Sequence, residues 1–185
     1  MNIGLIIYGI IVLLYVITFI FIREKEKRDS VFLKISFLFL FIILAIREPY
    51  SDMSEYLKYF HWFHNMPLNQ VMNFSLEPLF KLLTKFIGDI WFEDRFFISL
   101  IDFITIIGPY YFIKKYSKNY LLSVLLFVAI GSFSLEFYCL RQAIATSIIL
   151  FSIKYIENNN FFKFFGMGLI AFLFHKSALF FLPIY

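Results

Sequence analysis

The amino-acid sequence is dominated by long apolar runs, which short charged or polar segments separate. The first run, Ile3–Ile22, has twenty consecutive residues without a charge, enough helix to cross about 30 Å of hydrocarbon. Hydrophobic residues make up 61% of the chain, well above the share of roughly half that is typical of soluble domains. These features exclude an ordinary soluble domain and predict an all-α polytopic membrane protein. Because no small-residue cleavage site follows the first run, we expect a retained helix rather than a signal peptide.

The runs predict about six transmembrane helices within a single membrane domain that covers residues 1–185. A charged hinge at Arg23–Asp29 separates the first two spans. At the other end, His175–Ser177 interrupts the apolar pattern before Ala178–Tyr185. The predicted spans are Ile3–Ile22, Val31–Ile46, Phe96–Ile113, Tyr120–Tyr138, Gln142–Ile156 and a last one that starts with Phe161–Phe174.

The net charge of +4 is interpreted as a topology signal and not as a nucleic-acid footprint. Lys and Arg in short loops mark the cytoplasmic side, and here they gather in residues 23–34, 114–118 and 154–163. These three regions fall on the same side if every span crosses once. The amino terminus, residues 47–95, residues 136–142 and His175 are then expected outside. Cys139 is the only cysteine, which excludes an intramolecular disulfide.

Residues 47–95 form an extracytoplasmic segment in which we expect amphipathic helices. Ser51 and Asp52 precede Glu55 in the manner of a capping box, and Glu77-Pro78 is typical of a helix start. After Pro78, apolar residues follow a helical stripe, which predicts a helix lying in the membrane interface. The face opposite this stripe consists of Lys81, Thr84, Lys85 and Gly88.

Arg141 and Gln142 place polar groups between two apolar runs. A charged side chain near bilayer depth costs roughly 2.5–3.5 kcal/mol on insertion scales, so it usually has a partner or a function. An arginine at the outer end of a helix is a bidentate ligand for phosphate or pyrophosphate. The alternative is an ion pair with Glu136 that tethers the corner between two spans.

His175, followed by Lys176 and Ser177, is a candidate for proton transfer near neutral pH. The alternative is a hydrogen-bonded histidine at the membrane interface. A Ser/His nucleophile pair has little support, because the sequence has no Gly-x-Ser-x-Gly motif.

Carboxylates of the outer segment are further candidates. Arg47, Glu48 and Asp52 together suit a hydroxyl-rich substrate that carries pyrophosphate, or else form a solvated loop with a helix cap at Asp52. Glu77 is a candidate for which a plain helix cap is the leading alternative. Tyr56 belongs to a group of aromatic residues that suit either sugar stacking or an interfacial aromatic belt.

Other charged residues inside or beside the spans point to structural roles. Asp102 is expected to be a partner for a neighbouring span. His61 and His64, three residues apart, could in principle bind a metal together with Asp52 or Glu55. No third ligand follows at a recognisable spacing, so no metal site is predicted.

Four short motifs, in order, resemble the EpsG family of bacterial exopolysaccharide and capsule clusters, which is similar to Wzy polysaccharide polymerases. After Arg47 they are SDMSEYLKYF at Ser51–Phe60, EPLF at Glu77–Phe80, LRQAIA at Leu140–Ala145 and FHKSAL at Phe174–Leu179. The resemblance implies glycosyl transfer at the outer face of the bacterial cytoplasmic membrane. The growing chain would leave its undecaprenyl-pyrophosphate carrier and join the next lipid-linked repeat unit, without a nucleotide sugar, metal or other cofactor. Other polysaccharide assembly proteins are the implied protein partners.

The resemblance also implies roles for individual residues. Arg141, with Arg47, would neutralise the leaving pyrophosphate. His175, Asp52 and Glu77 are alternative bases for the acceptor hydroxyl, and the family does not choose between them. Family members usually continue through several spans beyond FHKSAL, so we expect this chain to be the amino-terminal part of a longer protein. The substrate contacts assigned in this way are Arg47, Tyr56, Gln142 and Lys176.

Two other functions fit parts of the sequence. A polysaccharide exporter or a flippase subunit for lipid-linked oligosaccharides would also place polar residues along a path through the membrane. Internal symmetry would favour this alternative, and the sequence shows none. A hydrolase or acyltransferase based on His175 lacks a companion nucleophile.

Overall fold

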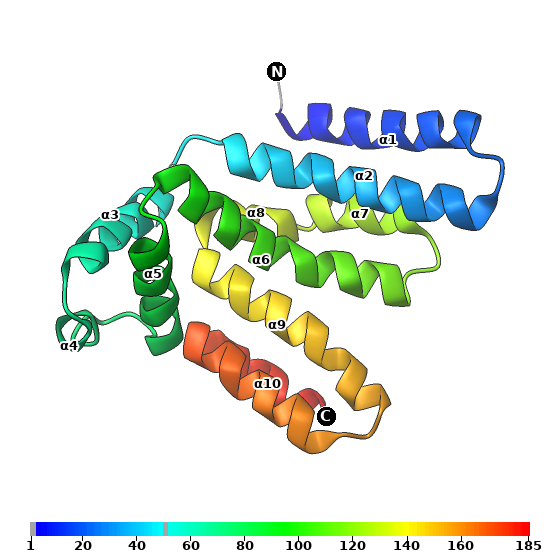
Figure 1. Ribbon diagram of the computed structural model, residues 1–185. Helices are drawn as coiled ribbons and strands as arrows, with labels where there is room; N and C mark the ends of the chain where they lie inside the picture. The colour runs from blue at the N-terminus through cyan, green and yellow to red at the C-terminus, as the bar shows by residue number, and fades with distance from the viewer. Residues whose placement is uncertain (1–2, 50–51) are drawn as a thin grey trace.

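The computed structural model describes residues 3–49 and 52–185, and all regular elements in these ranges are helices (Figure 1). This confirms the all-α prediction. Helix α6 packs against α2 on one side and α9 on the other, while α1 packs on α2 and α10 on α9. The bounds of these helices are α1 Ile3–Phe21, α2 Lys25–Ile46, α6 Asp94–Tyr116, α9 Leu140–Glu157 and α10 Phe161–Phe174.

Side-chain caps fix where several helices of this bundle begin. The carboxylate of Glu93 accepts a hydrogen bond from the backbone N–H of Arg95 at 2.9 Å, at the start of α6. Asn119 and Asn160 accept first-turn N–H groups of α7 (Tyr120–Ala129) and α10, each at 3.1 Å. Such caps satisfy backbone donors that have no partner within the helix, so each helix starts at a defined residue.

Two helices in the described part of the chain, α2 and α6, are long and apolar enough to cross a membrane. Leu5–Phe21, Tyr120–Ala129 and Phe161–Phe174 are shorter apolar helices. The structure is therefore that of a membrane-like helical bundle, and the number of six spans stays a prediction.

The predicted hinge and the predicted fourth span both differ from the structure. Residues 25–29 of the expected hinge form the first turns of α2, which begins at Lys25. The expected span Tyr120–Tyr138 is broken into α7 and α8 (Ser132–Tyr138). Gly131, between them, has a φ of 83°, a left-handed conformation that glycine adopts without steric cost. One continuous helix over this stretch was a wrong prediction.

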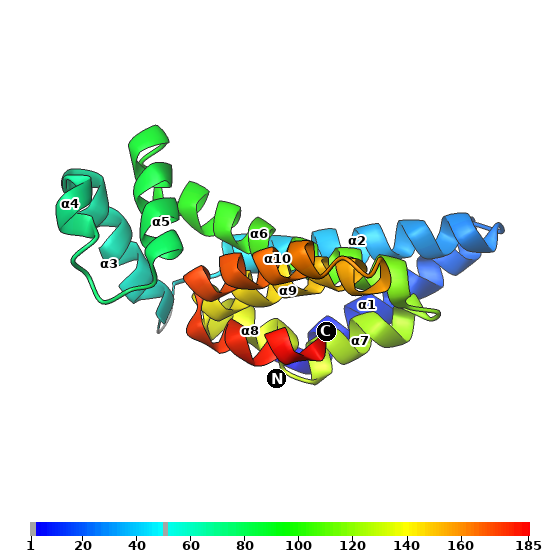
Figure 2. The same cartoon turned by 90° about the horizontal axis from the view of Figure 1, so that it is seen from below.

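The chain reverses direction at His175, which confirms the predicted interruption. The 3₁₀ helix η1 (Lys176–Ile184) then runs back along α10 (Figures 1 and 2). A Cβ at Gly168 of α10 would meet the end of the Leu182 side chain of η1, so a larger residue there would require that side chain to shift.

Helices α3 (Asp52–Asn65), α4 (Leu68–Val71) and α5 (Pro78–Ile90) form a lobe at one end of the bundle (Figure 2). Helix α5 runs across the direction of the bundle helices, as an interfacial helix would (Figure 1). It begins at Pro78, as predicted. The capping box predicted around Ser51 involves a residue outside the described ranges.

The predicted polar face of α5 is mostly buried, contrary to the prediction of an exposed polar face. Lys81 is buried, and its ammonium group donates to the backbone carbonyls of Met72 at 2.7 Å and Phe74 at 2.9 Å. The exposed face carries the apolar residues Leu82 and Phe86 instead. Helix α5 packs on α3 and α10, and its buried side combines polar residues with Phe80 and Ile87 of the apolar stripe, so only part of that stripe faces outward. The buried residues of the predicted polar face are Lys81, Thr84 and Gly88.

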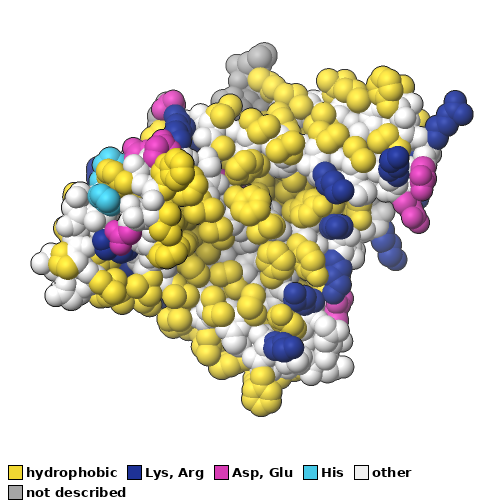
Figure 3. Space-filling model, viewed as in Figure 1, with side chains coloured by type: hydrophobic (Ala, Val, Ile, Leu, Met, Phe, Trp, Pro, Cys, Tyr) yellow, Lys and Arg dark blue, Asp and Glu magenta, His cyan; other side chains and the backbone are white. Residues whose placement is uncertain are grey.

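The three basic regions lie at the opposite end of the bundle from this lobe. The turns between α1 and α2, α6 and α7, and α9 and α10 all occur there, and Figure 3 shows Lys and Arg side chains gathered at that end. Lys115 of α6 and Glu157 of α9 form an ion pair at 2.5 Å. This arrangement is the one expected from the charge pattern.

Candidate active site

Four candidate residues from separate parts of the chain meet beside the lobe. Arg141, in the first turn of α9, forms an ion pair through Nη1 with Oε2 of Glu77. Its Nε donates to the hydroxyl of Tyr56 at 3.4 Å, and the guanidinium carbon lies 5.8 Å from the centre of the Tyr56 ring. The arginine therefore joins α3, α5 and α9 at one point.

Glu77 is the central carboxylate of this site. It occupies the N-cap position of α5, yet its side chain makes no capping hydrogen bond. Its second oxygen, Oε1, lies 3.3 Å from Nδ1 of His175, at the end of α10. The Glu77 side chain is 8% exposed, against 25% for Arg141 and 28% for His175. Glu77 thus links the two groups that are best suited to anion binding and proton transfer.

The surroundings favour the ionised form of Glu77. Burial alone would raise the pKa of its carboxyl group, but hydrogen bonding to its own backbone N–H and the charge and hydrogen bond of Arg141 outweigh this and lower the pKa. At Tyr56, burial outweighs the effect of the nearby Arg141, and the pKa of the hydroxyl is raised. The site therefore combines an anionic carboxylate with a neutral phenol.

A cavity of about 330 Å³ opens next to Glu77. Ser75, Leu76 and Pro78 contribute one wall, and the end of α10 contributes Phe172 and Leu173. Lys176, which is exposed, completes the lining. The space has both polar and apolar walls, as a sugar-binding site requires.

The other two predicted residues of this region lie at its edge. Asp52 is exposed in the first turn of α3, one turn before Tyr56, where its negative charge contributes to raising the pKa of the tyrosine. Gln142 is half-buried beside Arg141 in α9. Both are close in sequence to residues of the site, which is why the motifs contain them.

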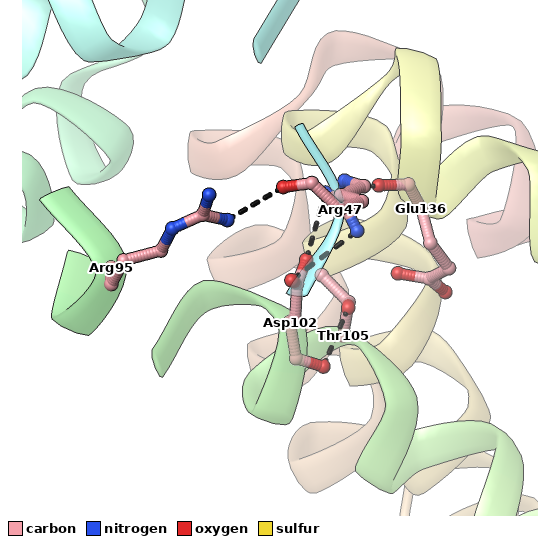
Figure 4. A network of polar contacts seen from close by, with 5 residues as sticks. All are labelled: Arg47, Arg95, Asp102, Thr105 and Glu136. Atoms are coloured by element: carbon pink, nitrogen blue, oxygen red, sulfur yellow. Dashed lines mark hydrogen bonds and ion pairs between the residues drawn. The ribbon is translucent and has the colours of Figure 1, made fainter. Parts of the chain in front are cut away.

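Arg47 lies in a separate polar network (Figure 4). Its Nη1 and Nη2 donate to the Asp102 carboxylate at 3.2 and 3.0 Å, and Nη2 also donates to the backbone carbonyl of Glu136 at 2.8 Å. The guanidinium carbon lies 5.0 Å from the centre of the Phe137 ring. The side chains of Arg47 and Asp102 are only 9% and 0% exposed. Asp102 is therefore a partner for a neighbouring helix, as predicted.

Arg95 extends this network toward the lobe. Its Nη1 donates to the backbone carbonyl of Arg47 at 2.7 Å (Figure 4). Its Nη2 lies 3.3 Å from Oε1 of Glu48. The sequence grouped Arg47 and Glu48 with Asp52, but in the structure Arg47 contacts Asp102 and Glu48 contacts Arg95. Sequence reasoning missed both Arg95 and Phe137, because nothing in the spacing links them to Arg47.

The alternative interpretation of Arg141, an ion pair with Glu136, is wrong. Arg141 pairs with Glu77, and Glu136 is 3% exposed, with no hydrogen-bond partner for its Oε2 among the described residues. The chain bends at Cys139 between α8 and α9, so residues five apart do not share a helix face.

The two histidines of α3 have separate partners. Nε2 of His61 lies 2.6 Å from Oδ1 of Asp94, and Nδ1 of His64 lies 2.9 Å from the carbonyl oxygen of Gly88. Within residues 3–49 and 52–185, no three His, Cys, Asp or Glu side chains are grouped so that they could hold a metal ion.

Comparison with known proteins places the chain in a family. The EpsG family profile matches residues 30–185, which includes all the residues of the site. EpsG is a polysaccharide polymerase-like family, which associates the chain with polysaccharide biosynthesis at a membrane. Searches of curated proteins and of solved structures found no match. Because the match covers most of the sequence, the chain belongs to the EpsG family.

Proposed function

We propose that this chain belongs to a membrane glycosyltransferase that polymerises undecaprenyl-pyrophosphate-linked repeat units into exopolysaccharide or capsule. The reaction would take place at the outer face of the bacterial cytoplasmic membrane. The observation that carries this proposal is the pairing of Glu77 with both Arg141 and His175, beside a cavity at the end of the bundle away from the basic turns. One such site provides a cation for a leaving pyrophosphate and a base for an acceptor hydroxyl.

His175 is the proposed general base. With Nδ1–H donated to Oε1 of Glu77, the imidazole would be held in the tautomer whose Nε2 accepts a proton. The acceptor hydroxyl oxygen forms a bond to the anomeric carbon of the donor chain while its proton passes to Nε2. The bond between that carbon and the pyrophosphate oxygen breaks, and the pyrophosphate leaves with the electron pair. Glu77 orients the histidine and stabilises its charged form.

Arg141 is the proposed ligand of the leaving pyrophosphate. Nη1 and Nε contact Glu77 and Tyr56, while Nη2 has no hydrogen-bond partner among the described residues. A guanidinium fixed in this way stabilises charge as it develops on the leaving group and needs no reorganisation. Tyr56 and Lys176 are proposed substrate contacts, and Gln142 and Asp52 are proposed to border the binding site.

Arg47 is proposed to act indirectly. Its guanidinium makes three hydrogen bonds, two to the Asp102 carboxylate and one to the carbonyl of Glu136, so it would hold α2, α6 and α8 together. Because the chain passes from Arg47 into α3, this network would set the position of Tyr56.

The test is the length profile of surface polysaccharide and of lipid-linked oligosaccharide in cells that lack the full-length gene. Single repeat units should accumulate on the lipid carrier, and the wild-type gene should restore polymer, while Arg141→Ala and His175→Ala should not. His61→Ala is the matched control, because His61 also pairs with a carboxylate at this end of the protein but lies outside the site. Normal polymer from both site variants would refute the proposal. Repeat units trapped on the cytoplasmic leaflet would favour the flippase or exporter alternative.

A further inference from the structure

A polar hollow lies at the basic end of the bundle, between the turn that joins α1 to α2 and the turn that joins α6 to α7. Its volume is about 170 Å³. Lys25 and Arg28 line it from the first turns of α2, and Lys118 lines it from the loop after α6. Three cations from two separate turns therefore face one space.

The positive charge of this hollow is largely unneutralised. Lys25 and Lys118 are exposed, and neither forms a hydrogen bond or an ion pair with a described residue. Arg28 has a partner, since its Nε lies 3.3 Å from Oδ1 of Asp29, which also lines the hollow. Asp29 is the carboxylate that lines the hollow beside three cations, and Glu26 lines an adjoining hollow with Asp29 and Lys118. The lining of the hollow itself keeps a net positive charge, which favours an anionic group.

On the side of the bundle helices the lining is aromatic and aliphatic, and Asn119 adds a polar side chain. Tyr15 of α1 and Leu121 of α7 line the hollow and pack against the buried hydrophobic cluster shared by α1, α2 and α7. A ligand that fits both halves has a phosphate-like head and an apolar part that follows α1 and α7. A free phosphate ion would use the cations alone.

The surroundings strengthen this preference. Figure 3 shows further Lys and Arg side chains at the same end of the molecule. Basic residues near an anionic membrane surface attract its lipids, and basic pockets between helix ends bind their head groups.

We propose that this hollow binds the phosphate head group of an anionic phospholipid, with Lys25 and Lys118 as its principal ligands. The hollow lies at the end of the bundle opposite the α3–α5 lobe (Figure 1), whereas Arg141 and His175 contact Glu77 at the start of α5, so this inference is independent of the proposed function. The lipid would join the α1–α2 pair to α6 and α7 at the membrane surface.

The test is native mass spectrometry of the full-length, detergent-solubilised protein titrated with phosphatidylglycerol or with phosphatidylcholine of the same acyl chains. The wild type should bind phosphatidylglycerol preferentially. Lys25→Gln/Lys118→Gln should bind it about thirtyfold more weakly, because each basic residue near the surface contributes about 1 kcal/mol. The arginine pair Lys25→Arg/Lys118→Arg should keep the preference, since it keeps both charges.

The matched control is Lys27→Gln/Lys163→Gln, which removes the same charge from exposed positions that do not line the hollow. It should lose much less phosphatidylglycerol binding than Lys25→Gln/Lys118→Gln. An equal loss in the control would show diffuse attraction and overturn the site. Absence of any preference in the wild type would do the same, whatever the variants do. Competition by glycerol phosphate at the concentration at which the lipid binds would overturn the lipid assignment in favour of a small anion.

Discussion

Replacing Glu77 with glutamine tests the centre of the candidate site, because this change keeps the shape of the side chain and removes its charge. The variant loses the contacts that the carboxylate makes with Arg141 and with His175, and both of these partners are partly exposed. Fully buried pairs cost about 3–5 kcal/mol when one partner is removed, and surface pairs about 0–1 kcal/mol. The side chains of Glu77, Arg141 and His175 are 8%, 25% and 28% exposed, so this site lies between the two cases. We therefore expect the substitution to lower the free energy of unfolding by about 2 kcal/mol, which matches the usual contribution of a hydrogen bond to a charged group.

The predicted loss corresponds to a fall in melting temperature of about 4–8 °C for a chain of this size. The pKa of Glu77 is lowered in the folded protein, so its contribution to stability is complete above the ordinary value of 4.5. It is lost as the pH falls through the lower folded pKa. The difference in melting temperature between the wild type and Glu77→Gln should therefore be largest near neutral pH and shrink below about pH 4.5.

The assay is thermal unfolding in detergent between pH 3.5 and 7, with polymer synthesis measured in parallel. Glu55→Gln is the control, because Glu55 pairs with Lys58 at 2.5 Å on the exposed face of α3 and should change the melting temperature by little. Polymer synthesis should fall by about 10²–10⁴-fold in Glu77→Gln, the usual contribution of positioned acid–base groups. An unchanged melting temperature at pH 7, or a difference that does not vary with pH, would refute the assigned pairing.

Further substitutions test the packing around the site by the same unfolding measurement. Asp102→Asn should destabilise the protein by about 3–5 kcal/mol, because it leaves the buried Arg47 without its counter-charge, whereas Arg47→Met/Asp102→Leu should lose much less. Equal losses in the single and double variants would contradict the pairing. Gly108→Ala should cost about 1–3 kcal/mol, because its new methyl group would lie 2.6 Å from the Cα of Ser147. Gly166→Ala, which meets nothing within 4 Å, should instead be neutral or stabilising, and a loss there as large as in Gly108→Ala would exclude crowding as the cause.

Features that depend on local sequence were predictable. Helix α10 has the bounds Phe161–Phe174 that the apolar run indicated, and α5 begins at Pro78 because proline suits the first turn of a helix. Gly131 shows the limit of this reasoning. A single residue in a left-handed conformation ends α7, and an apolar run by itself does not reveal it.

Contacts between distant segments were harder to predict. The sequence indicated that Asp102 needs a partner, but 55 residues separate it from Arg47. For Glu77, the helix-cap alternative was equally consistent with the sequence, and only the positions of α9 and α10 show that its carboxylate turns to Arg141 and His175. Likewise, the polar side of α5 is buried because α3 covers it, which no helical pattern within α5 could show.

The contact between α6 and α9 constrains how a large substrate could reach the site. The hydroxyl of Ser147 in α9 accepts a hydrogen bond from the N–H of Gly108 at 3.0 Å and donates to the carbonyl of Ile104 at 2.8 Å. Because this hydroxyl is inserted into the backbone ladder of α6, a sliding movement of α9 would break both bonds and drive Ser147 against the turn at Gly108. Helices α6 and α9 therefore form a fixed wall that carries Arg141. We expect the entry and release of a growing polysaccharide to involve displacement of the α3–α5 lobe against that wall.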